Sequence, residues 1–243
     1  MPQWIDTHVH WDRYGSAERA ELLTRATGEA VVFISVSVDI ESSKASLALD
    51  GAVGAVVGVH PKFISVPFEK ELRELARDPK VVAIGECGFD AAGPGWEIQA
   101  QAFALQCALA RELALSVVLH IDGEGAWEQL RAAEASLDGL SAVRHYFTGD
   151  ELQADWHRAR GHYLSFGNPL RREPRLREIA RQYPPDLLLI ETDSYPATGR
   201  NTEPAHVAKV GESLALVHGW TFAHAREQLA ANTRAAFRVR VPG

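Results

Sequence analysis

The sequence is poor in sulfur-containing residues and in long apolar runs. It holds two cysteines, Cys87 and Cys107, and one methionine among 243 residues. So few cysteines exclude the disulfide framework of a small secreted scaffold and are typical of a reducing compartment. No cationic apolar leader opens the chain, and no apolar run reaches the length of about 18 residues that a membrane-spanning helix needs. We therefore expect a soluble cytoplasmic protein.

Basic residues are also fewer than acidic residues. The chain has 25 lysines and arginines against 32 aspartates and glutamates, for a net charge of −7. This balance excludes a protein with the broad basic face that wraps long duplex DNA, although local basic patches remain possible. Hydrophobic residues make up 46% of the chain, enough for a large core, and we find no repeat, low-complexity tract or linker. We expect one domain over residues 1–243.

Short β-branched runs alternate with segments of helical period along the chain. A first strand opens at Trp4-Ile5, and further strands are predicted over 30–36, 53–59, 81–84, 116–119, 142–144, 163–166 and 187–190. Parallel strands with crossover helices follow from this alternation. Eight such units in this length predict an α/β fold of the TIM (β/α)₈ barrel type, which needs about 250 residues. An open doubly wound sheet is the alternative.

Polar residues at the ends of the predicted strands favour the barrel. In a barrel all carboxyl ends of the strands converge on one face, whereas the first, fourth and eighth strands of an open sheet do not meet. Each residue also has an ordinary structural interpretation, such as a turn histidine, a packed core histidine or a capping carboxylate. Their joint occurrence at strand ends favours a site. The residues are His8, His10, His60, Glu86, His120, His145 and Asp193.

Imidazole and carboxylate ligands suit divalent transition metals. His8 and His10 point the same way because side chains alternate along a strand. Four of these five histidines, together with the two carboxylates, are already too many for one tetrahedral ion that keeps a position open for water. Two divalent ions bridged by a carboxylate would use them all and would clamp the attacking and leaving oxygens of a hydrolytic reaction.

Several ordered motifs together resemble the TatD family of metal-dependent hydrolases. They are residues 6–10 (DTHVH) with Asp12, 58–61 (GVHP), 83–90 (AIGECGFD), the helix with Gln99, Phe103, Gln106, Leu109 and Ala110 leading to His120, 145–149 (HYFTG), 191–193 (ETD), Glu203-Pro204 and 232–237. The resemblance covers nearly the whole chain. It implies a TIM barrel and metal-dependent hydrolysis, usually of phosphodiester bonds in DNA.

The resemblance also implies roles for individual residues. His8, His10, Glu86 and Asp193 would hold one metal, and Glu86, His120 and His145 the second, with Glu86 bridging. The ions would be Zn²⁺, Mg²⁺ or Mn²⁺. Asp193 would orient or deprotonate the attacking water. His60 would contact the scissile phosphate or its leaving group. Catalytic roles therefore fall on Asp193, Glu86 and His60.

The chain departs from the family pattern at several positions. Asp122 stands where the family often has an arginine, which reverses a charge near the expected phosphate. Lys62 replaces a second histidine, Tyr146 replaces a cysteine, and Thr202 replaces an asparagine. None of these changes removes an expected metal ligand. They bear on which substrate the site accepts.

Four arginines follow the seventh predicted strand, at positions 171, 172, 175 and 177. If the loop lies over the catalytic face, Arg171 or Arg172 would bind phosphate and compensate for the missing arginine. The alternative is a solvated helix face. Arg200 and Lys62 are similar candidates.

The leading interpretation is a deoxyribonuclease that trims short or single-stranded DNA at 3′ ends. Hydrolysis of a small lactone, amide or phosphoester on the same metals is a second interpretation, because similar barrels host many chemistries. A third is a subunit of a larger assembly with weak catalysis, which an exposed apolar patch would support.

Overall fold

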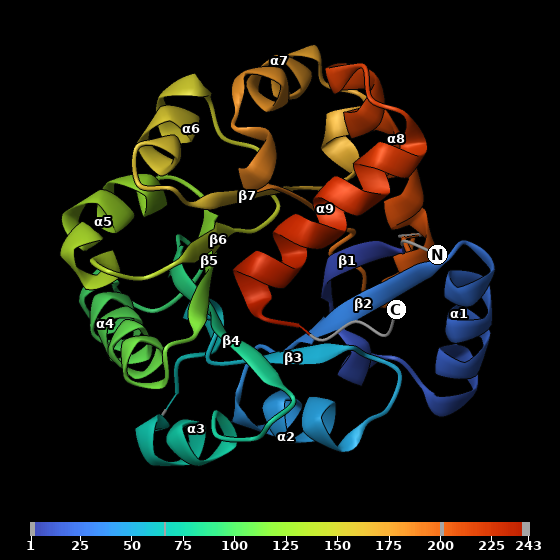
Figure 1. Cartoon of the computed structure of the whole chain (residues 1–243). Helices are drawn as coiled ribbons and strands as arrows, with labels where there is room; N and C mark the ends of the chain where they lie inside the picture. The colour runs from blue at the N-terminus through green and yellow to red at the C-terminus, as the bar shows by residue number, and fades with distance from the viewer. Residues whose placement is uncertain (1–2, 66, 200–201, 240–243) are drawn as a thin grey trace. The chain divides into compact units, whose positions relative to one another are not determined.

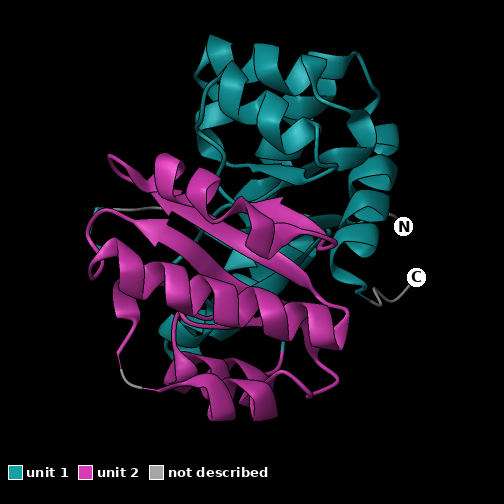
Figure 2. Cartoon of the chain, turned by 90° about the vertical axis from the view of Figure 1, so that its left-hand side faces the viewer, with its two compact units in different colours: residues 1–35, 51–53, 145–243 teal, residues 36–50, 54–144 magenta. Residues whose placement is uncertain are grey.

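The computed structural model describes residues 3–65, 67–199 and 202–239, so the candidate Arg200 lies outside the described residues. Strands and helices alternate along this chain from β1 to α9 (Figure 1). The chain divides into two compact units (Figure 2). The terminal unit comprises residues 1–35, 51–53 and 145–243, and the central unit comprises residues 36–50 and 54–144. Among the described residues, no helix combines the length and apolar character needed to cross a membrane.

The terminal unit contains four parallel strands. β1 (Trp4–Val9) pairs with β2 (Val31–Val36), and β7 (Tyr163–Phe166) pairs with β8 (Leu188–Ile190). A parallel bridge between Val9 and Ser194 brings the segment after β8 beside the end of β1. Its helices are α1 (Ser16–Gly28), α6 (Glu151–Arg158), α7 (Pro174–Gln182), α8 (Val207–His218) and α9 (Phe222–Phe237), with short 3₁₀ turns η1 (Trp11–Arg13), η4 (Asn168–Arg171), η5 (Pro185–Leu187) and η6 (Pro204–His206).

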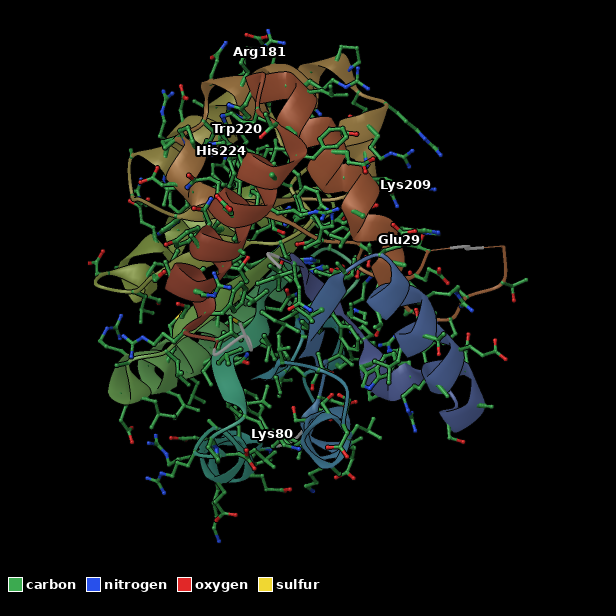
Figure 3. All side chains as sticks on the ribbon, turned by 45° about the vertical axis from the view of Figure 1, so that its right-hand side comes forward. Glu29, Lys80, Arg181, Lys209, Trp220 and His224 are labelled. Carbon is green, nitrogen blue, oxygen red and sulfur yellow. The ribbon has the colours of Figure 1, made fainter. Side chains whose placement is uncertain are left out.

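The core of the terminal unit lies between these strands and helices. Leu164 and Ile190 of the strands and Leu176 and Leu214 of the helices are fully buried in one cluster. These strand residues are apolar on both faces because parallel strands are covered on both sides. The side chains of Glu29, Arg181 and Lys209, by contrast, extend into solvent (Figure 3).

The central unit contains the other four strands, each parallel to the next. They are β3 (Gly54–Val57), β4 (Val81–Asp90), β5 (Ser116–Asp122) and β6 (Ala142–Arg144). The helices are α2 (Ile40–Ala48), α3 (Glu69–Leu75), α4 (Trp96–Leu113) and α5 (Ala126–Ala132), with 3₁₀ turns η2 (Pro61–Phe63) and η3 (Glu134–Leu137).

Two glutamines on the buried face of α4 hold the ends of two strands. Gln106 accepts a hydrogen bond from the backbone N–H of Val59 at 2.8 Å and donates one to its carbonyl at 2.9 Å. Gln99 makes the same pair of bonds with the backbone of Asp90, at 2.8 and 2.9 Å. Buried backbone groups need such partners where strand pairing ends. The two side chains therefore fix the chain just before His60 and at the end of β4.

The predicted strands are confirmed, but two extend further than expected. β4 runs through Glu86 to Asp90, and β5 runs through His120 to Asp122. Gly88 pairs with His120, and a Cβ atom on Gly88 would lie 2.1 Å from the His120 carbonyl oxygen. Only glycine fits this close approach, which also has a φ of +141°. Glu86 and His120 thus project from within the strands, where pairing fixes their backbone.

Candidate metal centre

Three predicted ligands of the terminal unit meet where β1 and β8 end. His8 lies in β1, His10 follows it, and Asp193 follows β8. The Nε2 atoms of His8 and His10 lie 3.9 and 3.4 Å from the same Oδ1 atom of Asp193. One ligand atom from each residue lies within 4.8 Å of the other two. Ligands about 2.1 Å from a tetrahedral ion are about 3.4 Å apart, so this donor set fits one divalent metal.

The backbone of these ligands is held by a buried carboxylate. Asp6 accepts hydrogen bonds from the backbone N–H of His8 at 3.1 Å and of Thr192 at 3.0 Å, and from the Thr192 hydroxyl at 2.5 Å. Burial raises the pKa of Asp6 well above its usual value, and these hydrogen bonds oppose that shift. Asp6 therefore links His8, one predicted ligand, to Thr192, which directly precedes the predicted ligand Asp193.

Asp193 is placed by an unusual backbone and by its histidine neighbours. Its φ of +49° lies in the left-handed region, which few non-glycine residues adopt. Burial works to raise the pKa of Asp193, but the hydrogen bond with His10 and the charges of His8 and His10 lower it to about 2. The side chain is thus a carboxylate at neutral pH, the form that binds a metal.

His145 joins this group from the residue after β6. Its ring stacks on His8 with centroids 4.2 Å apart, and its Nδ1 atom lies 3.2 Å from Oε1 of Glu191. The same Glu191 oxygen accepts the backbone N–H of Tyr146 at 2.9 Å. A carboxylate on Nδ1 leaves Nε2 available as the metal-binding nitrogen. We call His8, His10, His145, Glu191 and Asp193 the terminal cluster.

The central unit holds the remaining predicted residues. The Nδ1 atom of His120 lies 3.4 Å from Oε1 of Glu86, and its Nε2 atom lies 2.8 Å from Oδ2 of Asp90. The ring of His60 lies beside that of His120, with centroids 4.1 Å apart. His60, Asp90 and His120 also offer ligand atoms within 4.8 Å of one another. We call His60, Glu86, Asp90 and His120 the central cluster.

A lysine places positive charge at the central cluster. The Nζ atom of Lys62 lies 3.2 Å from Oδ2 of Asp90, and the His60 Nδ1 atom accepts the Lys62 backbone N–H at 3.0 Å. Burial opposes ionisation of Asp90, but hydrogen bonds from His120, the Ala92 N–H and Lys62 hold its pKa well below the usual range. Asp122, where the family pattern has an arginine, is exposed at the end of β5.

Sequence reasoning assigned no role to Asp6, Asp90 or Glu191. All three nevertheless lie within the motifs described for the sequence. Asp90 and Glu86 are four residues apart on β4, and Glu191 and Asp193 are two apart, spacings that place side chains on one side of an extended chain. These spacings from predicted ligands make Asp90 and Glu191 candidates from the sequence alone. The bridging role of Glu86 involves ligands from both clusters and stays a prediction.

Comparisons with known proteins identify the family. The family model of TatD related DNase matches residues 5–238. The uncharacterized metal-dependent hydrolase YabD of Bacillus subtilis is 30% identical, over 97% of this chain and 99% of its own length. The 3′-5′ ssDNA/RNA exonuclease TatD of Erwinia amylovora is 34% identical, over 88% of this chain and 90% of its own.

A solved structure confirms the predicted fold class. The crystal structure of YjjV, a TatD homologue from Escherichia coli K12, superposes with a TM-score of 0.86 at 26% identity. The superposition covers 98% of this chain and 99% of YjjV. With eight parallel strands alternating with helices, this confirms the (β/α)₈ class. Sequence motifs, fold and relatives agree, and the chain belongs to the TatD related DNase family.

Proposed function

We propose that this protein is a metal-dependent phosphodiesterase that hydrolyses single-stranded nucleic acid, with short DNA strands and their 3′ ends as its preferred substrate. The observation that carries this proposal is the convergence of His8, His10 and Asp193 on one point in the terminal cluster. Relatives named as metal-dependent hydrolases and as 3′-5′ ssDNA/RNA exonucleases support the reaction and the substrate class.

We propose that the site binds two divalent ions, Zn²⁺, Mg²⁺ or Mn²⁺, for which imidazole and carboxylate groups are suitable ligands. His8, His10, Glu86 and Asp193 would hold one, and Glu86, His120 and His145 the other. Within each cluster the imidazole nitrogens and carboxylate oxygens lie at distances that allow a shared ion. When bound, the ions supply Lewis acidity and lower the pKa of a coordinated water to about 7.

The residues of the chain contribute position and proton transfer. Asp193 keeps a second carboxylate oxygen for the attacking water, and it would orient that water and accept its proton. His120 and His145 are each fixed by a carboxylate, Asp90 and Glu191 respectively, so the remaining ring nitrogen would be available to bind a metal. His60 would hold a phosphate oxygen or the leaving group.

The family match also supports one domain. It runs without a break from residue 5 to residue 238 and so includes both compact units. Among the described residues, the exposed large apolar side chains belong to five different elements. These side chains are Phe63, Ile98, Leu152, Leu216 and Phe222. Their distribution does not favour a subunit that acts mainly through an apolar docking face.

One assay tests the proposal. Purified protein with Mg²⁺, Mn²⁺ or Zn²⁺ is given labelled single- and double-stranded DNA, with Asp193→Asn as the control. We expect metal-dependent cleavage of single strands and a loss of about 10²- to 10⁴-fold in the variant. If no DNA is cleaved with any metal, the nuclease proposal is wrong. A panel of lactones and phosphotriesters then tests the small-molecule alternative.

A further inference from the structure

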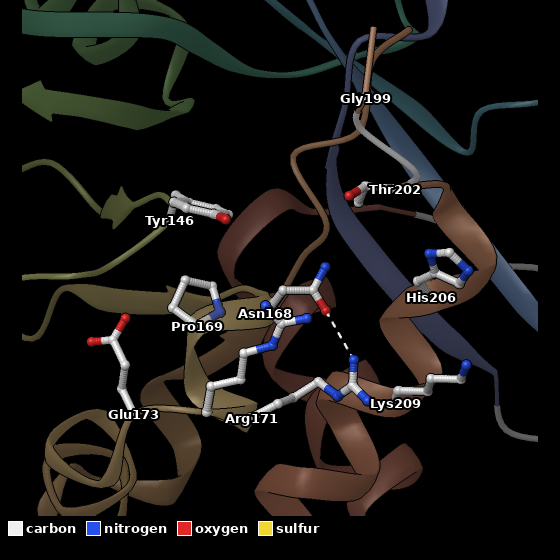
Figure 4. A pocket seen from close by; sticks show the side chains of 10 residues that line it. Tyr146, Asn168, Pro169, Arg171, Glu173, Gly199, Thr202, His206 and Lys209 are labelled. Carbon is white, nitrogen blue, oxygen red and sulfur yellow. Dashed lines mark hydrogen bonds between the residues drawn. The ribbon is translucent and has the colours of Figure 1, made fainter. Parts of the chain in front are cut away.

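A basic pocket lies beside the terminal cluster. It has a volume of about 550 Å³, within the range of small-ligand sites of roughly 300–1,000 Å³. Figure 4 shows Tyr146 on one side of the pocket, His206 and Lys209 on the other, and Asn168 and Arg171 between them. Arg172 completes the basic lining. Tyr146 directly follows His145, so the pocket and the terminal cluster share this stretch of chain.

The positive charges of the pocket are not neutralised by the carboxylates around them. Within the part of the chain that the structure describes, neither Arg171, Arg172 nor Lys209 forms an ion pair with a carboxylate. The neighbouring carboxylates pair with other residues. Glu203 binds Arg25, with a shortest distance of 2.7 Å, and lies 4.0 Å from Nε2 of His206, while Glu173 pairs with Arg175 at 3.8 Å. Three cations around one hollow repel one another, and a bound anion removes that repulsion.

The four arginines of this loop form two pairs: one pair binds backbone carbonyls, and the other lines the pocket. Arg175 donates to the carbonyls of Thr148 and Gly149, and Arg177 donates to those of Leu170 and Arg171. These bonds fix the loop that carries the other pair. Arg171 and Arg172 follow Pro169, whose carbonyl accepts the Arg172 N–H at 3.0 Å. Their guanidinium groups are therefore presented from a rigid turn, which reduces the entropy lost when they bind an anion.

The wall opposite the cations is aromatic and closely supported. Tyr146 has a φ of +43°, and its backbone N–H is bound by Glu191. A Cβ atom on Gly167 would lie 2.6 Å from the Tyr146 ring, so the glycine lets the ring lie flat against the chain. The ring is half-buried and lines the pocket. An aromatic face opposite a cationic cluster is the arrangement that binds a base and its phosphate in single-strand sites.

We propose that this pocket binds a nucleotide of the substrate strand other than the one being cleaved, with Arg171, Arg172 and Lys209 on the phosphates on either side of it and Tyr146 on its base. This inference rests on the proposed function, because it places the strand in relation to the terminal cluster. The pocket would give this acidic protein a local basic surface that contacts a few phosphates of the strand.

Binding without turnover tests the proposal. A short fluorescein-labelled oligothymidylate is titrated with the purified protein in EDTA, and anisotropy is followed between about 25 and 250 mM NaCl. The variant is Arg171→Ala/Arg172→Ala. The matched control is Arg158→Ala/Arg181→Ala, which removes two exposed arginines of α6 and α7 that pair with Asp155 and Glu178. Both double variants lose the same charge.

We expect the pocket variant to weaken binding about tenfold at the lowest salt. The slope of log K against log[salt] should become shallower by about 1.4, that is, about 0.7 for each single-strand phosphate that the variant no longer neutralises. Arg171→Lys/Arg172→Lys should restore the slope. The control should match the wild type. Equal slopes for the pocket variant and the control, or no measurable binding of the strand by the wild type, would overturn the proposal.

The aromatic wall has its own readout. The wild type should bind oligothymidylate about tenfold more tightly than an abasic strand of the same length, and Tyr146→Leu should remove that preference. Equal binding of both strands by the wild type would contradict base stacking on Tyr146.

Hydrolysis of bis(p-nitrophenyl) phosphate separates the two proposals. For the pocket variant, kcat/KM for the oligonucleotide should fall about tenfold more than kcat/KM for this small diester. If the wild type hydrolyses the diester and the pocket variant shows no such difference, the pocket assignment fails and the proposed reaction stands. If the wild type hydrolyses no diester but anisotropy behaves as expected, the proposed reaction fails and the pocket assignment stands.

Discussion

The Nδ1 atom of His145 lies 3.2 Å from Oε1 of Glu191, a fully buried carboxylate that also binds the backbone N–H of Tyr146. We predict that Glu191→Gln lowers metal affinity by about 10- to 100-fold, because the amide no longer fixes the tautomer and orientation of the His145 ring. Isothermal titration with Zn²⁺ or Mn²⁺ measures the change. Glu178→Gln, on the surface of α7, is the control, and equal affinities in the two variants would contradict this role.

Glu86 is the predicted bridge between the two ions. We predict that Glu86→Ala loses both metals, because a bridging carboxylate is a ligand to each. Elemental analysis of the purified protein measures metal content, and Glu97→Ala, an exposed residue of α4, serves as the control. Retention of two ions by the Glu86 variant would show that the bridging assignment is wrong.

A buried histidine pair should make folding stability depend on pH. Burial and the nearby charge of Arg160 lower the pKa of His162 to about 4, and its Nδ1 atom lies 3.2 Å from that of His157. Since the pKa is about 6.5 in the unfolded chain, the unfolded state takes up a proton first as pH falls. Stability should therefore be lost between about pH 6.5 and pH 4, by about 3 kcal/mol from this residue.

Chemical denaturation at several pH values measures this contribution. His162→Gln should reduce the loss of unfolding free energy between pH 7 and pH 4 relative to the wild type. His224→Gln, at an exposed position of α9, is the matched control. A His162 variant with the wild-type profile would show that the residue does not titrate between the folded and unfolded states.

Asn232 connects α9 to the start of β8. Its Nδ2 group donates to the carbonyls of Pro185 and Leu188, both at 2.8 Å. We predict that Asn232→Ala lowers the free energy of unfolding by about 2–4 kcal/mol, because two carbonyls lose their partner. Gln228→Ala, which removes only a donor to the Asn232 side chain, should cost less. Thermal unfolding of both variants measures the difference, and equal losses would contradict the role of Asn232.

The sequence predicted the strands well because their apolar runs are long enough to be buried on both faces, as residues 30–36 illustrate. It predicted the ends of β4 and β5 poorly. Gly85 and Gly88 read locally as strand breakers, but the close pairing of Gly88 with His120 requires a residue without a side chain. That requirement exists only in the paired strands.

The same limit applies to the polar residues of the site. Ligand types and strand ends are local features, and they indicated His8, His10, His120 and His145. The spacings on β4 and after β8 make Asp90 and Glu191 candidates, but which ring each carboxylate orients depends on which strand segments lie side by side. The arginines at positions 171–177 were equivalent in the sequence. The structure separates those that bind carbonyls from those that line a pocket.

Asp6 has a consequence for how the metal site tolerates change. Its two carboxylate oxygens accept hydrogen bonds from the backbone of His8 and from both the backbone and the hydroxyl of Thr192, although these two residues are far apart in the sequence. The spacing of the first ligand from the last is thus set by the covalent geometry of one small side chain. A glutamate at position 6 would have a longer side chain, and an asparagine would place its NH₂ donor against the N–H and O–H donors of His8 and Thr192. Neither replacement would therefore preserve these hydrogen bonds. A residue that is not a predicted metal ligand therefore constrains the site, because it links the segments that carry His8 and Asp193.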